Sequence, residues 1–87
     1  MDIVRKATAG TMQSSDLVVQ VEPAERLEIH IESTVKRQFE HLIRACIEET
    51  LRRHGVTRAV VRVSDRGALD YAIEARVETA LRRAAEA

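Results

Sequence analysis

The chain has 87 residues, enough for one compact domain and too few for two, so we expect a single domain over residues 1–87. It carries 14 basic and 14 acidic residues, a balance that argues against general electrostatic affinity for nucleic acid. Cys46 is the only cysteine, which excludes an intrachain disulfide and a multi-cysteine metal site. With no secretory signal and no membrane-spanning stretch, a soluble cytoplasmic domain is expected.

The first part of the chain predicts three strands. Apolar side chains alternate with others over residues 17–21 and again, more cleanly, over residues 27–31. That period is typical of strands with one face toward the core. Residues 3–12 predict a weaker strand, which pairs with the strand at 17–21 through a tip at residues 13–16.

After Ser33 the apolar period changes to that of a helix. The positions that recur at helical spacing are Val35, Phe39, Leu42, Ile43, Cys46, Ile47, Thr50 and Leu51. Ser33 or Thr34 is placed to cap the first turn, and Gly55 to end the helix as a C-terminal cap. Four charged residues at four-residue steps predict a ladder of exposed pairs, namely Glu40, Arg44, Glu48 and Arg52.

Residues 59–63 predict a short strand, and a second helix with one apolar face follows. That face comprises Leu69, Ala72, Ile73, Val77, Ala80, Leu81 and Ala84. The element order is therefore β-β-β-α-β-α. This order favours an α+β fold, a small two-layer sandwich of about four strands with both helices on one face of the sheet.

Residues that could serve metal or thiol chemistry have simpler structural explanations. Cys46 falls on the apolar stripe of the first helix, where burial raises the pKa of the thiol and hides the sulfur. The three histidines, His30, His41 and His54, share no metal-ligand spacing. We therefore expect neither a reactive thiol nor a metal site.

Binding residues are equally few. Small α+β sheets bind RNA by stacking bases on aromatic side chains, but Phe39 and Tyr71, the only aromatic residues, fall in predicted helices. Arg76 either buries its stem and carries its guanidinium to the rim, which we favour, or contacts a phosphate or carboxylate. Ser14 and Ser15 are ordinary turn residues on composition alone. The spacing of residues assigns no base or oxyanion donor to them.

Three stretches of the sequence resemble the acyl carrier protein (gamma) subunit of citrate lyase. They are ATAGTMQSSD at residues 7–16, STVKRQF at residues 33–39 and DRGALDYAIEARVE at residues 65–78. The resemblance covers nearly the whole chain in one register. It places the modified serine of that family on Ser14, and Ser15 stands where many relatives have glycine.

The resemblance implies a non-catalytic carrier subunit of a lyase complex, with no catalytic residue and no metal. It implies that Ser14 bears a phosphoribosyl dephospho-coenzyme A arm, attached covalently through a phosphodiester. The thiol of this prosthetic group holds acetyl and citryl thioesters while citrate is cleaved to oxaloacetate and acetate. The implied partners are the alpha (acyl transferase) and beta (citryl lyase) subunits and the transferase that attaches the arm, with no nucleic acid or membrane partner. The implied setting is citrate fermentation in the cytoplasm.

Two alternatives stay open from the sequence. The chain could be the carrier subunit of malonate decarboxylase, which uses the same type of arm, or a small interaction module that is never modified. The tip and residues 65–70 favour citrate lyase over malonate decarboxylase. Whether Ser15 can substitute for Ser14 is also open.

Overall fold

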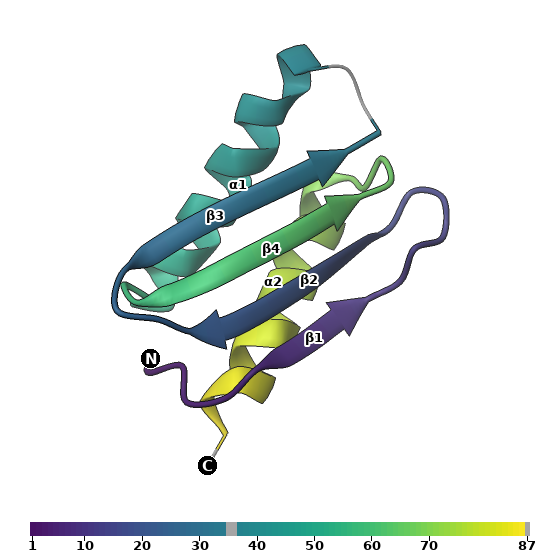
Figure 1. Cartoon of the computed structure of the whole chain (residues 1–87). Coiled ribbons are helices and arrows are strands. Elements are labelled where there is room, and N and C mark those ends of the chain that lie inside the picture. Colours follow the sequence, from purple (N-terminus) through teal and green to yellow (C-terminus); the bar gives the residue numbers. More distant parts are fainter. Residues whose placement is uncertain (35–36, 87) are drawn as a thin grey trace.

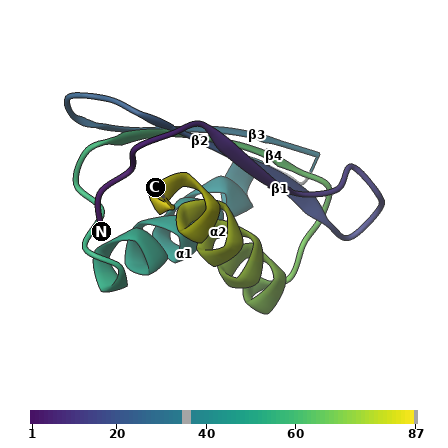
Figure 2. The same cartoon turned by 90° about the horizontal axis from the view of Figure 1, so that it is seen from below.

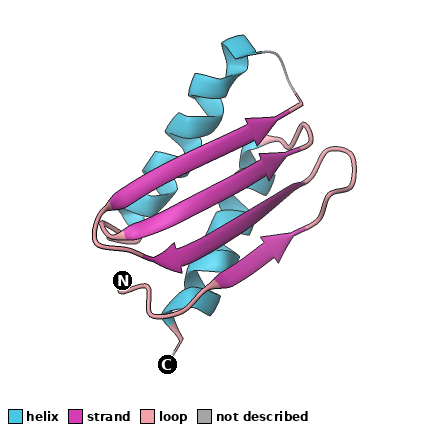
Figure 3. Cartoon of the chain, in the orientation of Figure 1, coloured by secondary structure: helices cyan, strands magenta, loops and turns pink. Residues whose placement is uncertain are grey.

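The computed structural model describes residues 1–34 and 37–86, which form a four-stranded sheet with both helices on one face (Figures 1 and 2). The strands are β1 (Ala7–Gly10), β2 (Leu17–Pro23), β3 (Leu27–Ser33) and β4 (Ala59–Asp65). The helices are the 3₁₀ turn η1 (Arg37–Phe39), α1 (Glu40–Arg53) and α2 (Asp70–Ala85). The predicted α+β fold class, two-layer arrangement and element order are confirmed (Figure 3).

The strands lie in the order β1-β2-β4-β3, so β4, the last strand in the chain, lies between β2 and β3. β2 is antiparallel to β1 and to β4, whereas β3 runs parallel to β4 at the edge of the sheet. The central position of β4 explains why Val60 and Val61, on opposite faces of the sheet, are both buried. This order also brings the β1–β2 tip and the loop after β4 to the same end of the sheet (Figure 1).

The core lies between the sheet and the two helices. Its largest fully buried apolar side chains are Leu17, Val19, Val21, Ile47, Leu51, Val61, Ile73, Val77 and Leu81. The alternation predicted for residues 17–21 is therefore confirmed. In β3, however, Leu27 is exposed and Ile29 and Ile31 are only half-buried, because β3 is an edge strand that pairs only with β4.

The first strand is shorter than predicted. Residues 3–6 lie outside β1, and the N–H groups of Val4 and Arg5 donate to the carbonyl of Ala84 at 2.9 and 3.0 Å. The carbonyls in the last turn of a helix have no partner within the helix, so this segment satisfies one of them at the end of α2. The chain start is thereby held against α2 instead of extending the sheet.

The predicted start of the first helix was wrong. Ser33 is the last residue of β3, and its hydroxyl donates to the carboxylate of Asp65 at 2.8 Å instead of capping a helix. Helix α1 begins at Glu40, and the residue before it, Phe39, provides no side-chain cap. Val35, which was assigned to the apolar stripe, lies outside the described residues. Phe39 and Leu42 belong to that stripe in the sequence but are exposed.

The end of the first helix was predicted correctly. Gly55 has a positive φ of 66° and its N–H donates to the carbonyl of Arg52. The N–H of Val56 donates to the carbonyl of Leu51, which completes a Schellman motif. In α2, Leu69 is the exposed N-cap residue and not part of the predicted apolar face.

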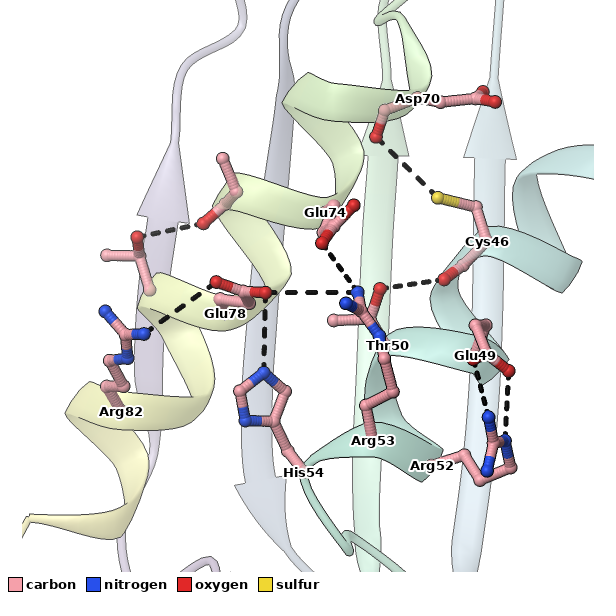
Figure 4. A network of polar contacts seen from close by, with 12 residues as sticks. Cys46, Glu49, Thr50, Arg52, Arg53, His54, Asp70, Glu74, Glu78 and Arg82 are labelled. Carbon is pink, nitrogen blue, oxygen red and sulfur yellow. Dashed lines mark hydrogen bonds and ion pairs between the residues drawn. The ribbon is translucent and has the colours of Figure 1, made fainter.

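The ladder predicted along α1 is replaced by other contacts. Arg44 donates to the carbonyl of Ile29 at 3.3 Å, and Arg52 pairs with Glu49, three residues before it. Arg53 reaches across to α2, where it pairs with Glu74 at 2.6 Å (Figure 4). Such exposed pairs contribute little stability, about 0–1 kcal/mol each. The buried apolar faces therefore hold the two helices on the sheet.

Candidate functional site

Ser14 lies in a tight turn at the tip between β1 and β2, which projects beyond the sheet (Figure 1). The N–H of Asp16 donates to the carbonyl of Gln13 at 3.1 Å, so Ser14 and Ser15 are the two central residues of the turn. Ser15 has a φ of 64° and is the only non-glycine residue with positive φ in the described part of the chain. This combination is that of a type II turn, in which glycine is favoured at the position of Ser15.

Gly10 closes the hairpin at the end of β1. Its φ is 99°, and a Cβ atom added there would lie 1.8 Å from the carbonyl oxygen of Leu17. No side chain can occupy that space without moving the backbone of the facing strand. The close approach lets the N–H of Thr11 donate to the same carbonyl at 3.1 Å.

The carboxylate of Asp16 accepts four hydrogen bonds and fixes the tip from within. One oxygen accepts from the N–H of Leu17 at 2.8 Å and from Nε of Arg76 at 3.1 Å. The other accepts from the hydroxyl of Thr11 and from Nη2 of Arg76 at 2.8 Å. The bonds from Arg76, then those from Thr11 and Leu17, hold the pKa of Asp16 far below its usual range. Asp16 therefore stays charged and acts as an anchor, not as a general base.

Arg76 connects the tip to α2. Of the two interpretations of this residue, contact with a carboxylate is the one that the structure shows, and the carboxylate belongs to Asp16 of the same chain. The pair is bidentate, with both Nε and Nη2 engaged, the geometry for which guanidinium suits carboxylates. The side chain of Arg76 remains 40% exposed although it is paired.

A second loop, which joins β4 to α2, supports the tip. The N–H of Ser15 donates to the carbonyl of Arg66 at 2.8 Å, and the N–H of Arg66 donates to the carbonyl of Asp16 at 2.9 Å. These two backbone bonds fix the position of the turn relative to the sheet. Ser14 takes part in neither bond and is exposed between them and α2.

Asp65 organises this second loop. Its carboxylate is buried and accepts from the hydroxyl of Ser33 at 2.8 Å and from the N–H groups of Gly67 and Ala68 at 3.2 and 2.9 Å. The backbone carbonyl of Asp65 accepts from the N–H of Thr34 at 3.2 Å. Asp65 thus joins the end of β4 to the end of β3, at the same end of the sheet as the tip.

A hollow of about 440 Å³ opens between the tip and α2. Its walls include Ser14 on one side and Tyr71, Ala75, Arg76 and Thr79 of α2 on the other. The small side chain of Ala75 leaves room between the larger ones. A serine hydroxyl, a guanidinium and an aromatic ring therefore face one shared space.

The other candidate residues lie away from this hollow. Cys46 is half-buried in α1, and its thiol lies 3.7 Å from the carbonyl of Asp70 (Figure 4). Burial, and then the charge of Asp70, raises the pKa of this thiol. His30 and His41 are exposed, and Nε2 of His54 lies 3.5 Å from Glu78. Within residues 1–34 and 37–86, no group of three or more acidic, histidine or cysteine residues could hold a metal ion. None of the helices found there is long and apolar enough to cross a membrane.

Two features of the site were not predicted from the sequence. The pair between Asp16 and Arg76 joins residues 60 positions apart, and no local pattern signals such a contact. The role of Asp65 was also missed, although an aspartate followed by Arg66 and Gly67 at the end of a strand is a typical loop signal.

Known proteins resemble this chain over most of its length. The protein family described as "Malonate decarboxylase delta subunit (MdcD)" matches residues 4–84. The citrate lyase acyl carrier protein of Albidiferax ferrireducens is 54% identical over 85 residues, covering 95% of this chain and 87% of that protein. Those of Halothermothrix orenii and Clostridium perfringens are 45% and 47% identical over 99% of this chain, and 93% and 87% of their own lengths are covered.

A solved structure has the same fold. It is the crystal structure of a Pseudomonas malonate decarboxylase hetero-tetramer in complex with malonate, one chain of which matches with a TM-score of 0.73. The match covers 93% of this chain and 84% of that chain, at 22% sequence identity. At this identity the likeness shows the fold alone.

Proposed function

The chain belongs to the citrate lyase acyl carrier protein family, and from this premise we propose that it is the non-catalytic acyl carrier subunit of a citrate lyase, with Ser14 as the residue that bears the covalent arm. The observation that carries the choice of Ser14 is the shape of the turn. Ser15 occupies the position with positive φ, where the family often has glycine, and its N–H is bonded to Arg66. Ser14 is exposed at the neighbouring position.

The proposed arm is phosphoribosyl dephospho-coenzyme A, which supplies a thiol that carries acyl groups as thioesters and so eases cleavage of the bond to the neighbouring carbon. The residues around Ser14 fit such a group. An exposed hydroxyl at a hairpin tip is accessible to a modifying enzyme. The charge of Asp16, which would repel a phosphodiester, is balanced by Arg76. The hollow beside Ser14 leaves space for a bulky substituent.

The task of the chain itself is to present the attachment point in a fixed position. The bonds of Asp16 and the two backbone bonds to Arg66 hold the turn, so that an arm on Ser14 starts from a defined place. Attachment to one carrier keeps the acyl group at high effective concentration near both partner active sites. Acid–base groups for the cleavage are supplied by the partners in this proposal.

The proposed partners are the alpha and beta subunits of citrate lyase and the transferase that attaches the arm. Exposed apolar side chains near the tip, those of Met12, Leu69 and Tyr71, suit contact with such partners. We propose the cytoplasm as the location, in agreement with a single cysteine that forms no disulfide within the chain.

The carrier subunit of malonate decarboxylase is the second candidate. It is favoured by the description of the matching family and by the fold of the solved hetero-tetramer chain. The relatives with 45–54% identity nevertheless carry the citrate lyase name. Supplying the loaded chain to each set of partner subunits separates the two, since only the correct set will turn over its substrate.

Coexpression with the transferase tests the attachment site. Ser14→Ala should stay at the unmodified mass and fail to support citrate cleavage with the other two subunits. The matched variant Ser15→Ala should gain the mass of the arm and support turnover. Loading of Ser14→Ala but not of Ser15→Ala would move the site by one residue. A wild-type chain that is never loaded would contradict the carrier function and favour an unmodified interaction module.

A further inference from the structure

We infer that the hollow between the tip and α2 is a binding subsite for the nucleotide portion of the arm on Ser14, with Arg76 facing its phosphate and Tyr71 its base. The inference rests on the proposed function and deepens it. It states that the first part of the arm is held against the carrier, and that only the part beyond the nucleotide moves freely.

The guanidinium of Arg76 is held in place by Asp16 before any ligand binds. A guanidinium has five N–H donors, and Arg76 uses one on Nε and one on Nη2 for Asp16. Nη1 donates no hydrogen bond to the described residues, and the side chain, which is 40% exposed, lines the hollow. Because Asp16 already holds the guanidinium in place, an arriving phosphate does not have to order it.

None of the carboxylates of α2 lines the hollow, and two of them, those of Glu74 and Glu78, pair elsewhere. Glu74 pairs with Arg53 of α1 at 2.6 Å, and Glu78 lies 3.5 Å from His54 (Figure 4). Both therefore lie on the side of α2 that faces α1, away from the tip. The hollow itself contains one acidic group, Asp16, whose charge is balanced by Arg76.

Tyr71 supplies a flat apolar surface to the same hollow. Tyr71 is 72% exposed, so a ligand in the hollow can contact its ring. Tyr71, Ala75 and Thr79 follow at four-residue steps and so line one stripe of α2 that faces the tip. A base that stacks on the ring would cover this surface, and stacking accepts any base because every base has a flat face.

The dimensions agree with this occupant. A volume of about 440 Å³ lies within the usual range for small-molecule pockets, about 300–1,000 Å³. The hollow starts at Ser14 itself, so the substituent can enter it without crossing the protein. Its opening to solvent lets the remainder of the arm extend toward a partner subunit.

Tyr71 also provides the measurement, because it is the only tyrosine and the chain has no tryptophan. We expect the fluorescence lifetime of Tyr71 to fall about twofold or more when the wild-type chain is loaded, as a stacked base quenches the ring. Intact mass measured on the same samples reports loading independently of the partner subunits.

Ala75→Leu is the variant that blocks the hollow, since Ala75 lines it and takes no part in the Asp16–Arg76 pair. The loaded Ala75→Leu protein should keep the lifetime of the unloaded protein. The matched control is Ala45→Leu, an exposed alanine in the middle of α1, which should show the wild-type decrease on loading. Equal quenching in loaded Ala75→Leu and wild type would overturn the inference.

A second measurement needs no variant. The backbone amide signals of Ala75 and Thr79 in the wild-type chain should shift on loading, whereas that of Ala45 should not. A loaded chain with an unchanged Tyr71 lifetime and unchanged amide signals would overturn the subsite while leaving the carrier function intact. A chain that is not loaded at all would overturn the carrier function and the subsite with it.

Discussion

The tip at residues 11–16 and the loop at residues 66–69 lie side by side at one end of the sheet, and each is organised by one aspartate. Asp16 accepts from a charged partner on a distant helix, and its side chain is 15% exposed. Asp65 is 2% exposed, and within residues 1–34 and 37–86 its carboxylate accepts from neutral donors, a hydroxyl and two backbone N–H groups.

This difference separates a loop that stabilises the core from a tip that, in our proposal, presents Ser14. Asp65 belongs to the folded core of the molecule, since it joins the ends of two neighbouring strands. Asp16 fixes only the tip, which is held from outside by Arg76 and by the backbone of Arg66. We therefore expect a substitution at Asp65 to destabilise the whole fold, and a substitution at Asp16 mainly to misplace Ser14.

The largest expected effect comes from Gly10, at the end of β1, and is compared with Gly67, in the loop after β4. Gly10→Ala places a Cβ atom 1.8 Å from the carbonyl oxygen of Leu17 at a φ of 99°, and should cost about 3–5 kcal/mol of unfolding free energy. Gly67→Ala has a φ of 88° but no atom within 4 Å, and should cost only about 1–2 kcal/mol. Urea unfolding of both variants measures the difference. Equal costs would mean that the strands can separate at Gly10.

The next effect compares the two aspartates directly. Asp65→Ala leaves a hydroxyl and two N–H groups without their buried acceptor, and should cost about 2–4 kcal/mol. Asp16→Ala should cost less, because its donors can turn to water, yet it should slow loading of Ser14 more. Urea unfolding and the rate of mass gain with the transferase measure the two effects. If Asp16→Ala were loaded faster than Asp65→Ala and lost more stability, the roles assigned to the two aspartates would be reversed.

The sequence predicted the elements because each has a local signal. The alternation over residues 17–21 and the glycine that ends α1 depend on neighbouring residues, and both were predicted correctly. The strand order depends on the pairing of β2 with β4, which comes much later in the chain, and no local sequence pattern encodes this pairing. The start of α1 failed for a similar reason, since Ser33 satisfies Asp65, 32 residues away, and so does not cap the helix.

The site was predictable only in part. The family register predicts Ser14 as the attachment residue, and this assignment stays a prediction. Ser15 was predicted as a turn residue, and its place in the turn confirms this. The guanidinium of Arg76 could not be placed, because its partner Asp16 lies 60 residues earlier in the chain. Polar contacts between distant segments need the whole fold, whereas apolar periodicity needs only one element.

A smaller effect concerns pH. The pKa of Asp16 is lower in the folded chain, mainly through Arg76, so the unfolded chain binds more protons at acid pH. This contribution to stability is fully present above the unfolded pKa of about 3.9 and is lost as pH falls below it. Arg76→Met removes the main cause of the shift. The decrease in urea midpoint between pH 6 and pH 3 should therefore be shallower in Arg76→Met than in wild type; equal slopes would show that the pair contributes nothing.

The smallest effect tests the turn itself. Ser15 has a φ of 64°, a conformation that costs a residue with a Cβ about 1–2 kcal/mol, whereas glycine adopts it freely. Since glycine also gains entropy in the unfolded chain, Ser15→Gly should stabilise the unloaded protein by only about 0.5–1 kcal/mol. That gain corresponds to a rise in melting temperature of about 2–8 °C for a domain of this size.

Ser14→Gly is the matched control, because Ser14 has no positive φ to relieve and glycine there only adds freedom to the unfolded chain. It should lower the melting temperature of the unloaded protein, and it should not gain the mass of the arm. Ser15→Gly should still gain the full mass of the arm, since the N–H that binds Arg66 is kept. A rise in melting temperature for Ser14→Gly and a fall for Ser15→Gly would exchange the two positions in the turn. The residue that presents its hydroxyl would then be Ser15.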